Sequence, residues 1–543
     1  MNNYLINLKN IKNEPVKSYA PGSPEREELK KMVEKIHNEQ IEIPLIIGGK
    51  EIYTGNTGKV VEPQNHKHVL ATYHKAGEKE ILMAIDAARE AHKYWASLPW
   101  EHRASVFLKA AELLSTSWRP ILNAATMLNQ SKTPHQAEID AACEVIDFWR
   151  FNSKYMGEIY STQPDSTQGQ LNRMDYRPLE GFIFAVSPFN FTSIAANLAT
   201  APALMGNTIL WKPASTAILS GYYLMKLYRA AGLPDGVINF IPGSGATIGN
   251  IVLTHPELAG IHFTGSTNTF QSMWATVGKN IRKYKAYPRI VGETGGKDFV
   301  FVHPSADLDA VVANLLRGAY EYQGQKCSAA SRAYIPKSMW KEFIAKFEGE
   351  VKTIKMGDIR DFSVYMGAVI DEHAFDSIMG YIKIAQESDQ AEVIIGGNGD
   401  KSTGYFIEPT LILAKDPHFV TMQEEIFGPV LSVYVYDDNK YEETLHLCDQ
   451  TSPYGLTGSI FATDRLAIAK AEEILRWSAG NFYINDKPTG AVVNQQPFGG
   501  SRASGTNDKA GSYLNLIRWA TPRNIKETFT PVRDYRYPYM REE

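Results

Sequence analysis

The sequence predicts an α/β protein of two or three domains, and three observations support this. The chain has 543 residues, which is too many for one hydrophobic core. Its composition, 44% hydrophobic and 21% charged, is ordinary for a soluble globular protein. From about residue 180 onward, short apolar strands alternate with amphipathic helices. That alternation is typical of an open, mostly parallel sheet covered by helices.

The N-terminal part is predicted to be rich in helices. Residues 23–37 are charged and helical in pattern, with Ser23 as the expected N-cap and Pro24 at the first helical position. Apolar residues recur at helical spacing in three further segments, 79–95, 102–118 and 136–151. Residues 160–175 are polar and rich in turn formers, which predicts either a surface loop or a β-hairpin arm.

Two α/β regions are expected to follow. The first has strand candidates at 181–186, 208–211, 237–241 and 260–263, with helices at 218–231 and 247–253. The second is expected from about residue 289, with strand candidates at 290–291, 299–302, 333–335, 394–395, 431–435 and 459–461 and a helix at 338–348. The tail, 525–543, is rich in Tyr, Arg and Pro and is not predicted to form a packed helix.

Charge and cysteine content exclude several classes of function. The 60 acidic and 56 basic residues leave no basic excess that would favour nucleic acid or an anionic membrane. The three cysteines, Cys143, Cys327 and Cys448, suit neither a disulfide framework nor a metal site, and they fit a reducing compartment. No apolar run is long enough to span a bilayer. We expect a cytoplasmic protein or, alternatively, the mature form of a mitochondrial matrix protein.

Chemically suggestive residues cluster in short glycine-containing motifs. Cys327 lies in a small, polar segment, 324–328, where it fits a buried core thiol as well as a nucleophile. Asn190 and Lys212 follow two predicted strands, where α/β sheets bind ligands. Glycine and serine turns at 243–249 and 263–267 open helices and suit a nucleotide diphosphate, although the first is one residue longer than the dinucleotide fingerprint. Read singly, each of these motifs also fits an ordinary turn.

Taken together and in order, the motifs resemble the NAD(P)-dependent aldehyde dehydrogenase superfamily. The matching segments are an Asn loop, W-K-P-A, a glycine turn, F-T-G-S, E-x-G-G-K, G-Q-x-C, E-E-I-F-G-P and P-F-G-G, over residues 181–505. Segments 13–15, 22–26, 136–148, 187–191 and 495–508 further resemble the branch that oxidises L-glutamate γ-semialdehyde to L-glutamate in proline degradation.

The resemblance implies a domain plan and an assembly. It implies a Rossmann-type NAD-binding domain at 1–155 and 178–292, an α/β catalytic domain at 293–505, and a small β oligomerisation arm with its tail at 156–177 and 506–543. A homodimer or a higher homo-oligomer is expected. The resemblance implies no metal, nucleic acid or membrane partner.

The resemblance also implies a mechanism. Cys327 would attack the aldehyde, and Asn190 would stabilise the oxyanion together with the backbone N–H of Cys327. Glu293 would activate the water that hydrolyses the resulting thioester, which splits one difficult oxidation into two easier steps. No role follows for Gln325 or Lys326.

Binding residues are implied in the same way. The cofactor would be NAD, with NADP less favoured, although Ser215 stands where many NAD-preferring relatives carry Glu. The cofactor contacts implied are Ser187, Lys212, Gly265, Ser266, Thr267, Asn268, Thr269, Glu425 and Phe427. The substrate carboxylate would be held by Ser328, Gly490 and Ala491, and its aliphatic part by Phe191 and Phe498. Glu144 would neighbour the substrate ammonium group or would be an exposed helix acid.

Three other functions remain to be weighed. One is oxidation of a different small aldehyde. Another is a binding or structural role without activity, against which Cys327, Glu293 and Asn190 together argue. The third is fusion to a proline-oxidising enzyme, which would need a second flavin-binding barrel for which this chain has no room.

Overall fold

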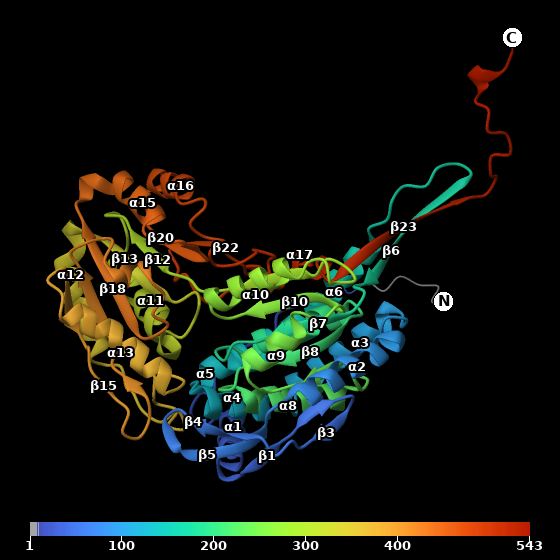
Figure 1. The fold of residues 1–543 in the computed structure, drawn as a ribbon. Helices are drawn as coiled ribbons and strands as arrows, with labels where there is room; N and C mark the ends of the chain where they lie inside the picture. The colour runs from blue at the N-terminus through green and yellow to red at the C-terminus, as the bar shows by residue number, and fades with distance from the viewer. Residues whose placement is uncertain (1–7, 9, 543) are drawn as a thin grey trace.

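Two seven-stranded sheets, each covered by helices, form the body of the molecule (Figure 1). The coordinates are a computed structural model that describes residues 8 and 10–542. The α/β architecture predicted from the sequence is confirmed. No helix in the described part of the chain combines the length and the apolar character needed to cross a membrane.

The first sheet has the order β11-β10-β7-β8-β9-β2-β3. From β11 to β9 its strands are parallel, whereas β2 pairs antiparallel with β9 and β3. The bounds are β2 (Leu45–Ile47), β3 (Lys50–Ile52), β7 (Phe182–Val186), β8 (Thr208–Lys212), β9 (Ile238–Phe240), β10 (Leu258–Thr264) and β11 (Arg289–Glu293). Residues 290–291 were predicted to belong to the second α/β region, which is wrong, because β11 pairs with β10 in the first sheet.

Helices cover both faces of the first sheet, because its strands are apolar on both sides. In β7, Phe182, Phe184 and Val186 pack into one hydrophobic cluster, while Ile183 and Ala185 pack into another. The first cluster includes α2 (Glu78–Trp95), α9 (Gly245–Val252) and α10 (Thr267–Lys279). The second includes α1 (Pro24–Asn38), α3 (Trp100–Ser115), α4 (Arg119–Gln130), α6 (Val145–Ser161), α7 (Thr192–Leu204) and α8 (Ile218–Ala231).

The N-terminal region is not purely helical, contrary to the expectation from sequence. It also contains β2, β3 and a three-stranded sheet of β1 (Ile41–Ile43), β4 (Thr57–Glu62) and β5 (Asn65–His74). Strands of three residues are too short to show a period in the sequence. The predicted helix at 136–151 is divided into α5 (Pro134–Ala137), a π-helical turn η1 (Glu138–Glu144) and α6. Ser23 precedes α1 as predicted, but its hydroxyl forms no hydrogen bond within the described chain.

The second sheet has the order β14-β17-β18-β13-β12-β20-β21, with only β14 antiparallel. Its strands are β12 (Asp298–Val302), β13 (Ala330–Pro336), β14 (Ala391–Ile395), β17 (Thr410–Ala414), β18 (Val430–Tyr436), β20 (Thr457–Phe461) and β21 (Asn481–Ile484). The helices are α11 (Leu308–Tyr320), α12 (Lys337–Val351), α13 (Glu372–Gln386), α14 (Val420–Gln423), α15 (Tyr441–Gln450) and α16 (Arg465–Ile474).

Short elements complete the chain outside these layers. They are η2 (Glu321–Gly324), β15 (Gly399–Asp400), β16 (Phe406–Ile407), η3 (Asp438–Lys440), β19 (Tyr454–Gly455), β22 (Ser501–Arg502), α17 (Tyr513–Ile517) and η4 (Pro538–Met540).

A two-stranded antiparallel ribbon extends away from both sheets, with the C-terminal tail beyond it (Figure 1). Its strands are β6 (Gln170–Pro178) and β23 (Ala520–Thr528), with Gln170 opposite Thr528. Residues 160–175 were predicted to form either a surface loop or a β-hairpin arm, and neither alternative is complete, because β6 begins at Gln170 and pairs with β23 instead of a neighbouring strand. The partner of β6 comes from the far end of the chain, and sequence patterns that depend on neighbouring residues could not reveal it.

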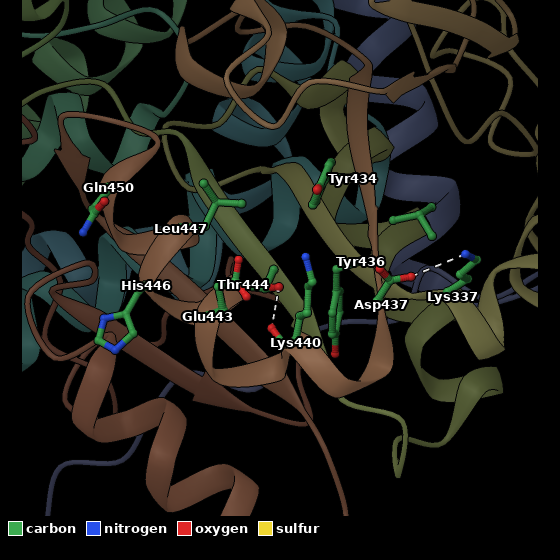
Figure 2. Close-up of a pocket in the computed structure, with 11 residues that line it drawn as sticks. Lys337, Tyr434, Tyr436, Asp437, Lys440, Glu443, Thr444, His446, Leu447 and Gln450 are labelled. Atoms are coloured by element: carbon green, nitrogen blue, oxygen red, sulfur yellow. Dashed lines mark hydrogen bonds and ion pairs between the residues drawn. The ribbon is translucent and has the colours of Figure 1, made fainter.

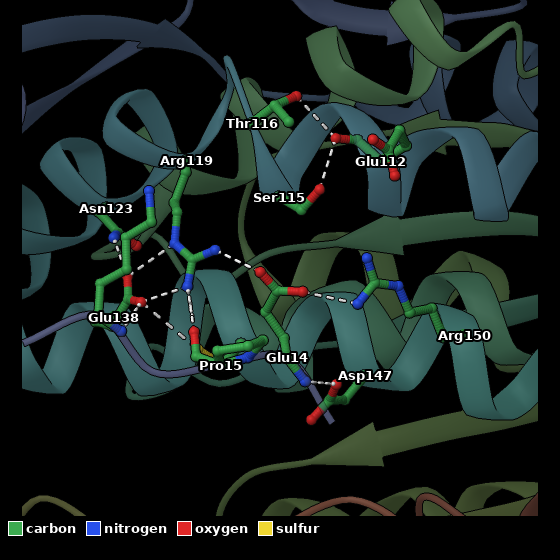
Figure 3. A network of polar contacts seen from close by, with 12 residues as sticks. Glu14, Pro15, Glu112, Ser115, Thr116, Arg119, Asn123, Glu138, Asp147 and Arg150 are labelled. Atoms are coloured by element: carbon green, nitrogen blue, oxygen red, sulfur yellow. Dashed lines mark hydrogen bonds and ion pairs between the residues drawn. The ribbon is translucent and has the colours of Figure 1, made fainter. Parts of the chain in front are cut away.

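A buried ionic network ties the segment before α1 to the helices behind the first sheet (Figure 3). Arg119 donates from Nη1 to Glu14 Oε1 at 2.6 Å and binds the Glu138 carboxylate with two further nitrogens. Arg150 donates to the other Glu14 oxygen at 2.7 Å. Burial alone would raise the pKa of Glu138, but the hydrogen bonds and charge of Arg119 hold that pKa below its usual range. Glu138 is therefore an anion, and its buried negative charge is compensated by Arg119.

We predict that Arg119→Met destabilises the fold by about 3–5 kcal/mol, because it leaves the Glu138 charge buried without a cation. Equilibrium unfolding in urea measures the loss. The pKa of Glu138 is depressed in the fold, so this stabilisation is present above the unfolded pKa and is lost as pH falls through the folded one. Lys93→Met, at an exposed pair with Glu90, is the control and should change little. Equal effects of the two substitutions would contradict the prediction.

Candidate active site

The candidate site lies where the carboxyl edge of the first sheet meets the amino edge of the second. Val186 lies opposite Lys212 and Phe263, and Thr264 lies opposite Glu293, so these strand ends share one edge. On the other side, Asp298 begins β12 opposite Ala330 of β13. Cys327 precedes Ala330 by three residues in the sequence and therefore faces the first sheet.

Cys327 follows a turn whose backbone is left-handed over successive residues. Tyr322, Gln323 and Gly324 have φ angles of 52°, 55° and 65°. Residues with a side chain are strained in this region by about 1–2 kcal/mol each. At Gly324 a Cβ atom would lie 2.1 Å from the carbonyl oxygen of Gly428, so only glycine fits. The surroundings must therefore hold this turn in place.

Two glutamine side chains supply that support. Gln323 donates to the carbonyl oxygens of Ser131 at 3.1 Å and Ala368 at 2.8 Å, and accepts from Gly367 N at 3.0 Å. Gln325 accepts from Ile370 N at 2.9 Å. No role for Gln325 followed from the sequence, and in the structure its side chain supports the turn through Ile370. Ile370 reaches Gln325 only in the folded chain, so no pattern in the neighbouring sequence could have indicated this contact.

Asn190 is brought to the cysteine loop from the end of β7. It is buried, and its Nδ2 donates to the backbone carbonyl of Gln325 at 3.1 Å. Its side-chain amide is therefore fixed two residues from Cys327, with one N–H already bound to the loop. An amide carries two N–H donors, which leaves the second for another acceptor.

Glu293 approaches the same place from the end of β11. Its Oε2 accepts a hydrogen bond from Gly500 N at 2.9 Å. Burial raises the pKa of Glu293 well above its usual value, while the Gly500 N–H and the Lys509 charge oppose this rise. Burial thus favours the protonated carboxyl group, whereas the Gly500 N–H and the Lys509 charge favour the carboxylate that a general base needs.

The Cys327 thiol is protonated at rest. Burial raises its pKa well above the usual value, and the carboxyl groups of Asp298, Glu425 and Glu293 add to the effect. Lys326, the adjacent residue, pairs with Glu321 at 3.2 Å instead of assisting the thiol. The acidity of the resting thiol could not be inferred from the sequence. In the structure the thiol is not activated by a neighbouring cation.

The residues expected to bind a cofactor line the same edge of the first sheet. Ser187 accepts from Trp211 Nε1 at 3.0 Å, and Lys212 Nζ donates to Pro213 O at 3.0 Å. Ser266 caps α10 by accepting from Thr269 N at 3.3 Å, so residues 265–269 form the N-terminus of a 13-residue helix. Such a terminus favours an anionic group. These residues fit a ligand with a diphosphate.

Glu425 lies near enough to the thiol for its charge to raise the pKa of Cys327. Its Oε1 accepts from Gly296 N at 3.0 Å, and burial raises its pKa to about 7. Phe427, two residues on, has a φ of 58°, and its ring meets that of Phe189 edge-on at 5.8 Å. The two side chains therefore face the gap between the sheets from the second sheet.

Two of the residues expected to bind substrate have defined contacts near the cysteine loop or within the C-terminal segment. Ser328 and Thr489 share a hydrogen bond of 2.8 Å between their hydroxyls, which joins the cysteine loop to the turn containing Gly490 and Ala491. Phe498 is fixed by two backbone hydrogen bonds to Ala510, at 3.0 and 2.7 Å.

Glu144 is partly buried rather than an exposed helix acid, so that alternative is wrong. It accepts from Ser193 Oγ at 2.9 Å. Burial, with Asp140 nearby, raises its pKa to about 8. The carboxyl group of Glu144 is therefore largely uncharged at neutral pH unless a cationic group binds beside it.

Sequence reasoning missed a buried lysine beneath the Asn190 loop. Lys132 pairs with Asp140 at 2.7 Å, and its Nζ lies 3.9 Å from the centre of the Phe191 ring. Asp140 accepts from the first two N–H groups of α7, at Thr192 and Ser193, at 3.0 and 2.8 Å. Asp140 belongs to segment 136–148, which is part of the family resemblance. This was the one indication in the sequence that Asp140 matters. Lys132 carried none.

Two other features lie away from Cys327. A hollow of about 480 Å³ is lined by Lys337, the end of β18 and α15 (Figure 2). It lies at the carboxyl edge of the second sheet, opposite to the edge that holds Cys327. Among the described residues, His37, Glu62 and His68 are grouped closely enough to bind a metal. The two rings stack at 4.1 Å, and both residues already form hydrogen bonds, which indicates a polar core cluster.

Comparison with known proteins gives a consistent result. A model of the aldehyde dehydrogenase family matches residues 52–518. The chain is 55% identical over 537 residues to "Delta-1-pyrroline-5-carboxylate dehydrogenase, mitochondrial" of Dictyostelium discoideum, covering 98% of this chain and 96% of that one. The human protein of the same name is 48% identical over 531 residues, covering 98% and 94%. The Mycobacterium tuberculosis Delta-pyrroline-5-carboxylate dehydrogenase crystallised with NAD superimposes with a TM-score of 0.96 at 50% identity, covering 99% and 100%.

We predict that alkylation of Cys327 by iodoacetamide, without cofactor, is slow at neutral pH and still accelerating at about pH 9, because an ordinary thiol ionises near 8.5 and this pKa is raised. Mass spectrometry after timed quenching measures the rate at each pH. Cys143 and Cys448 are buried, so a Cys327→Ala variant should resist modification. A rate that levels off near pH 7 would refute the neutral thiol.

Proposed function

The chain belongs to the aldehyde dehydrogenase family, and on that basis we propose that it oxidises L-glutamate γ-semialdehyde, the open form of 1-pyrroline-5-carboxylate, to L-glutamate with NAD. One observation carries the proposal. Cys327, Asn190 and Glu293, from three distant segments, converge between the two sheets in a chain about half identical to relatives named for this activity. The reaction belongs to proline degradation and yields glutamate.

The chain's own residues account for both halves of the reaction. The Cys327 sulfur bonds to the aldehyde carbon after its proton passes to a neighbouring carboxylate. The free N–H of Asn190 and the backbone N–H of Cys327 stabilise the oxyanion. Bound NAD supplies the hydride acceptor. Glu293 then takes a proton from the water that attacks the thioester, the carbon–sulfur bond breaks, and the thiolate leaves.

The cofactor would lie along the strand ends of the first sheet. The N-terminus of α10, at Gly265, Ser266, Thr267, Asn268 and Thr269, would hold the diphosphate. Lys212 would bind the adenosine ribose and Ser187 would contact the cofactor beside the Asn190 loop. Glu425 would bind the nicotinamide ribose. NAD-bound crystal structures of relatives support NAD, and Ser215 is the reason to compare NADP.

The substrate would be held by both its charged groups. Ser328 and the backbone N–H groups of Gly490 and Ala491 would bind the carboxylate, and Phe191 and Phe498 would pack on the aliphatic segment. An ammonium group beside Glu144 would lower the raised pKa of this acid and make it a counter-charge. A small aldehyde without these groups would gain none of those contacts.

The proposal extends to assembly and location. The arm and tail at 156–177 and 506–543, which include most of the β6–β23 ribbon, would form contacts in a homodimer or a higher oligomer, which sedimentation would detect as a mass above one chain. Exposed apolar side chains on the tail include Phe529, Val532, Tyr535, Tyr537 and Tyr539.

The proposed NAD-binding domain is 1–155 with 178–292, and the catalytic domain is 293–505. Relatives named mitochondrial support a matrix location, and the cytoplasmic one stays a prediction.

We predict a kcat/KM for glutamate γ-semialdehyde about 100-fold or more above that for propanal, because the smaller aldehyde leaves the buried polar groups unpaired. Succinate semialdehyde, which lacks the ammonium group, should fall between them. NADH absorbance with NAD and NADP in parallel gives the ratios. Equal values for the three aldehydes would favour the alternative of a less selective aldehyde dehydrogenase.

We predict that Glu293→Gln gives a burst of about one NADH per site followed by a steady state slowed about 10²–10⁴-fold, because only the hydrolytic step loses its base. Rapid mixing with excess substrate separates the two phases. Cys327→Ala is the matched control, expected to bind NAD without any burst. If both phases slowed equally in Glu293→Gln, Glu293 would not be the base of the second step.

A further inference from the structure

Lys509 lies beside Glu293 and has no role in the function described above. Its ammonium group donates to Gly480 O at 2.7 Å, Gly499 O at 3.0 Å and Asn481 Oδ1 at 3.3 Å. An ammonium group has three donors, so this side chain uses all of them within one small region. Its backbone has a φ of 52°, which is strained for a lysine. This strained backbone conformation coincides with a position from which the ammonium group reaches all three acceptors.

One acceptor of Lys509, Gly499 O, belongs to the turn that binds Glu293, and the other two lie at the start of β21, which binds that turn. Gly500 N donates to Glu293 Oε2, and the preceding residue, Gly499, gives its N–H to Asn481 Oδ1 at 3.2 Å. Asn481 in turn donates to Pro497 O at 3.1 Å. Lys509 and Asn481 therefore hold the turn from one side while Glu293 binds it from the other. A shift of this turn would carry away the N–H that orients the carboxylate.

Lys509 is also the cation that faces Glu293. The ionisable groups acting on Glu293 across the site are Lys509, Asp508 and the Cys327 thiol. Asp508 accepts from Thr506 Oγ1 at 2.6 Å and lies 3.6 Å from Arg518 Nε, which offsets its charge. Burial raises the pKa of Glu293, and the Lys509 charge lowers it. Loss of that charge would therefore favour the protonated carboxyl group further.

We propose that Lys509 is a positioning residue for thioester hydrolysis, because its ammonium group fixes the turn that binds Glu293 and places a positive charge near this carboxyl group. The inference rests on the proposed function. The step it serves is balanced: water attacks the thioester carbon, its proton moves to Glu293, and the sulfur leaves as thiolate. Lys509 exchanges no proton in this step and acts only through Glu293.

The test is Lys509→Met, compared with Lys509→Arg and wild type. In Lys509→Met the NADH burst should keep its amplitude and its rate to within about threefold, while the steady-state rate at neutral pH falls about 10–100-fold. Removing the cation raises the pKa of Glu293, so the steady-state rate should reach its maximum about one pH unit or more higher. Lys509→Arg keeps the charge and should keep the wild-type pH profile.

Asn481→Ala separates charge from geometry, because it loosens the same turn but keeps the ammonium group, which retains its bonds to Gly480 O and Gly499 O. It should lower the steady-state rate without moving the pH profile. Lys352→Met, at an exposed pair with Glu348, is the surface control and should resemble wild type. Should Lys509→Met fail to fold in a thermal melt, Lys509→Gln takes its place with the same readouts.

Three results would overturn the inference: equal loss of burst and steady state in Lys509→Met, an unmoved pH profile, or the same alkaline shift in Lys509→Arg. The proposed function fails in a different way. If wild type showed a burst and turnover with other aldehydes but not with glutamate γ-semialdehyde, the substrate assignment would fall, and Lys509 could still be tested on the aldehyde that reacts.

Discussion

The left-handed backbone of Tyr322, Gln323 and Gly324 turns the chain into the gap between the sheets just before Cys327. This conformation is unfavourable for residues with side chains, so it persists only because its surroundings determine it. Gln323 and Gln325 bind backbone at Ser131, Gly367, Ala368 and Ile370, and Asn190 binds the Gln325 carbonyl. The position of the sulfur thus depends on packing between both sheets, and the amide of Asn190 belongs to that support as well as to the proposed oxyanion site.

The electrostatics of the site follow from this burial. Acidic side chains from three segments, at Glu293, Asp298 and Glu425, face a thiol that is kept protonated, and each of them has a raised pKa. Neighbouring carboxyl groups disfavour one another's ionisation. A further negative charge can therefore form at this site only if a cation compensates for it or if a proton leaves the site. An arrangement of this kind suits a reaction that passes a proton between thiol, water and carboxyl group in successive steps.

Sequence patterns predicted the α/β class, most strands of both sheets and the short list of residues that meet at Cys327. They did so because parallel strands buried on both faces are apolar throughout, and because glycine turns mark strand ends. They missed β1 to β5, whose three shortest strands have no readable period, and the pairing of β6 with β23. Lys132 and Lys509 were invisible for the same reason: their importance lies in partners that only the fold supplies.

The ribbon of β6 and β23 has a consequence for the order of events during synthesis. Asp175 and Arg523 pair across it although 348 residues separate them in the chain. The ribosome therefore releases β6 long before its partner exists, while the first sheet and much of the second can already form. Until the last strand emerges, β6 offers an unpaired edge that other chains could add to. A nascent chain of this protein would need that edge shielded for most of its translation.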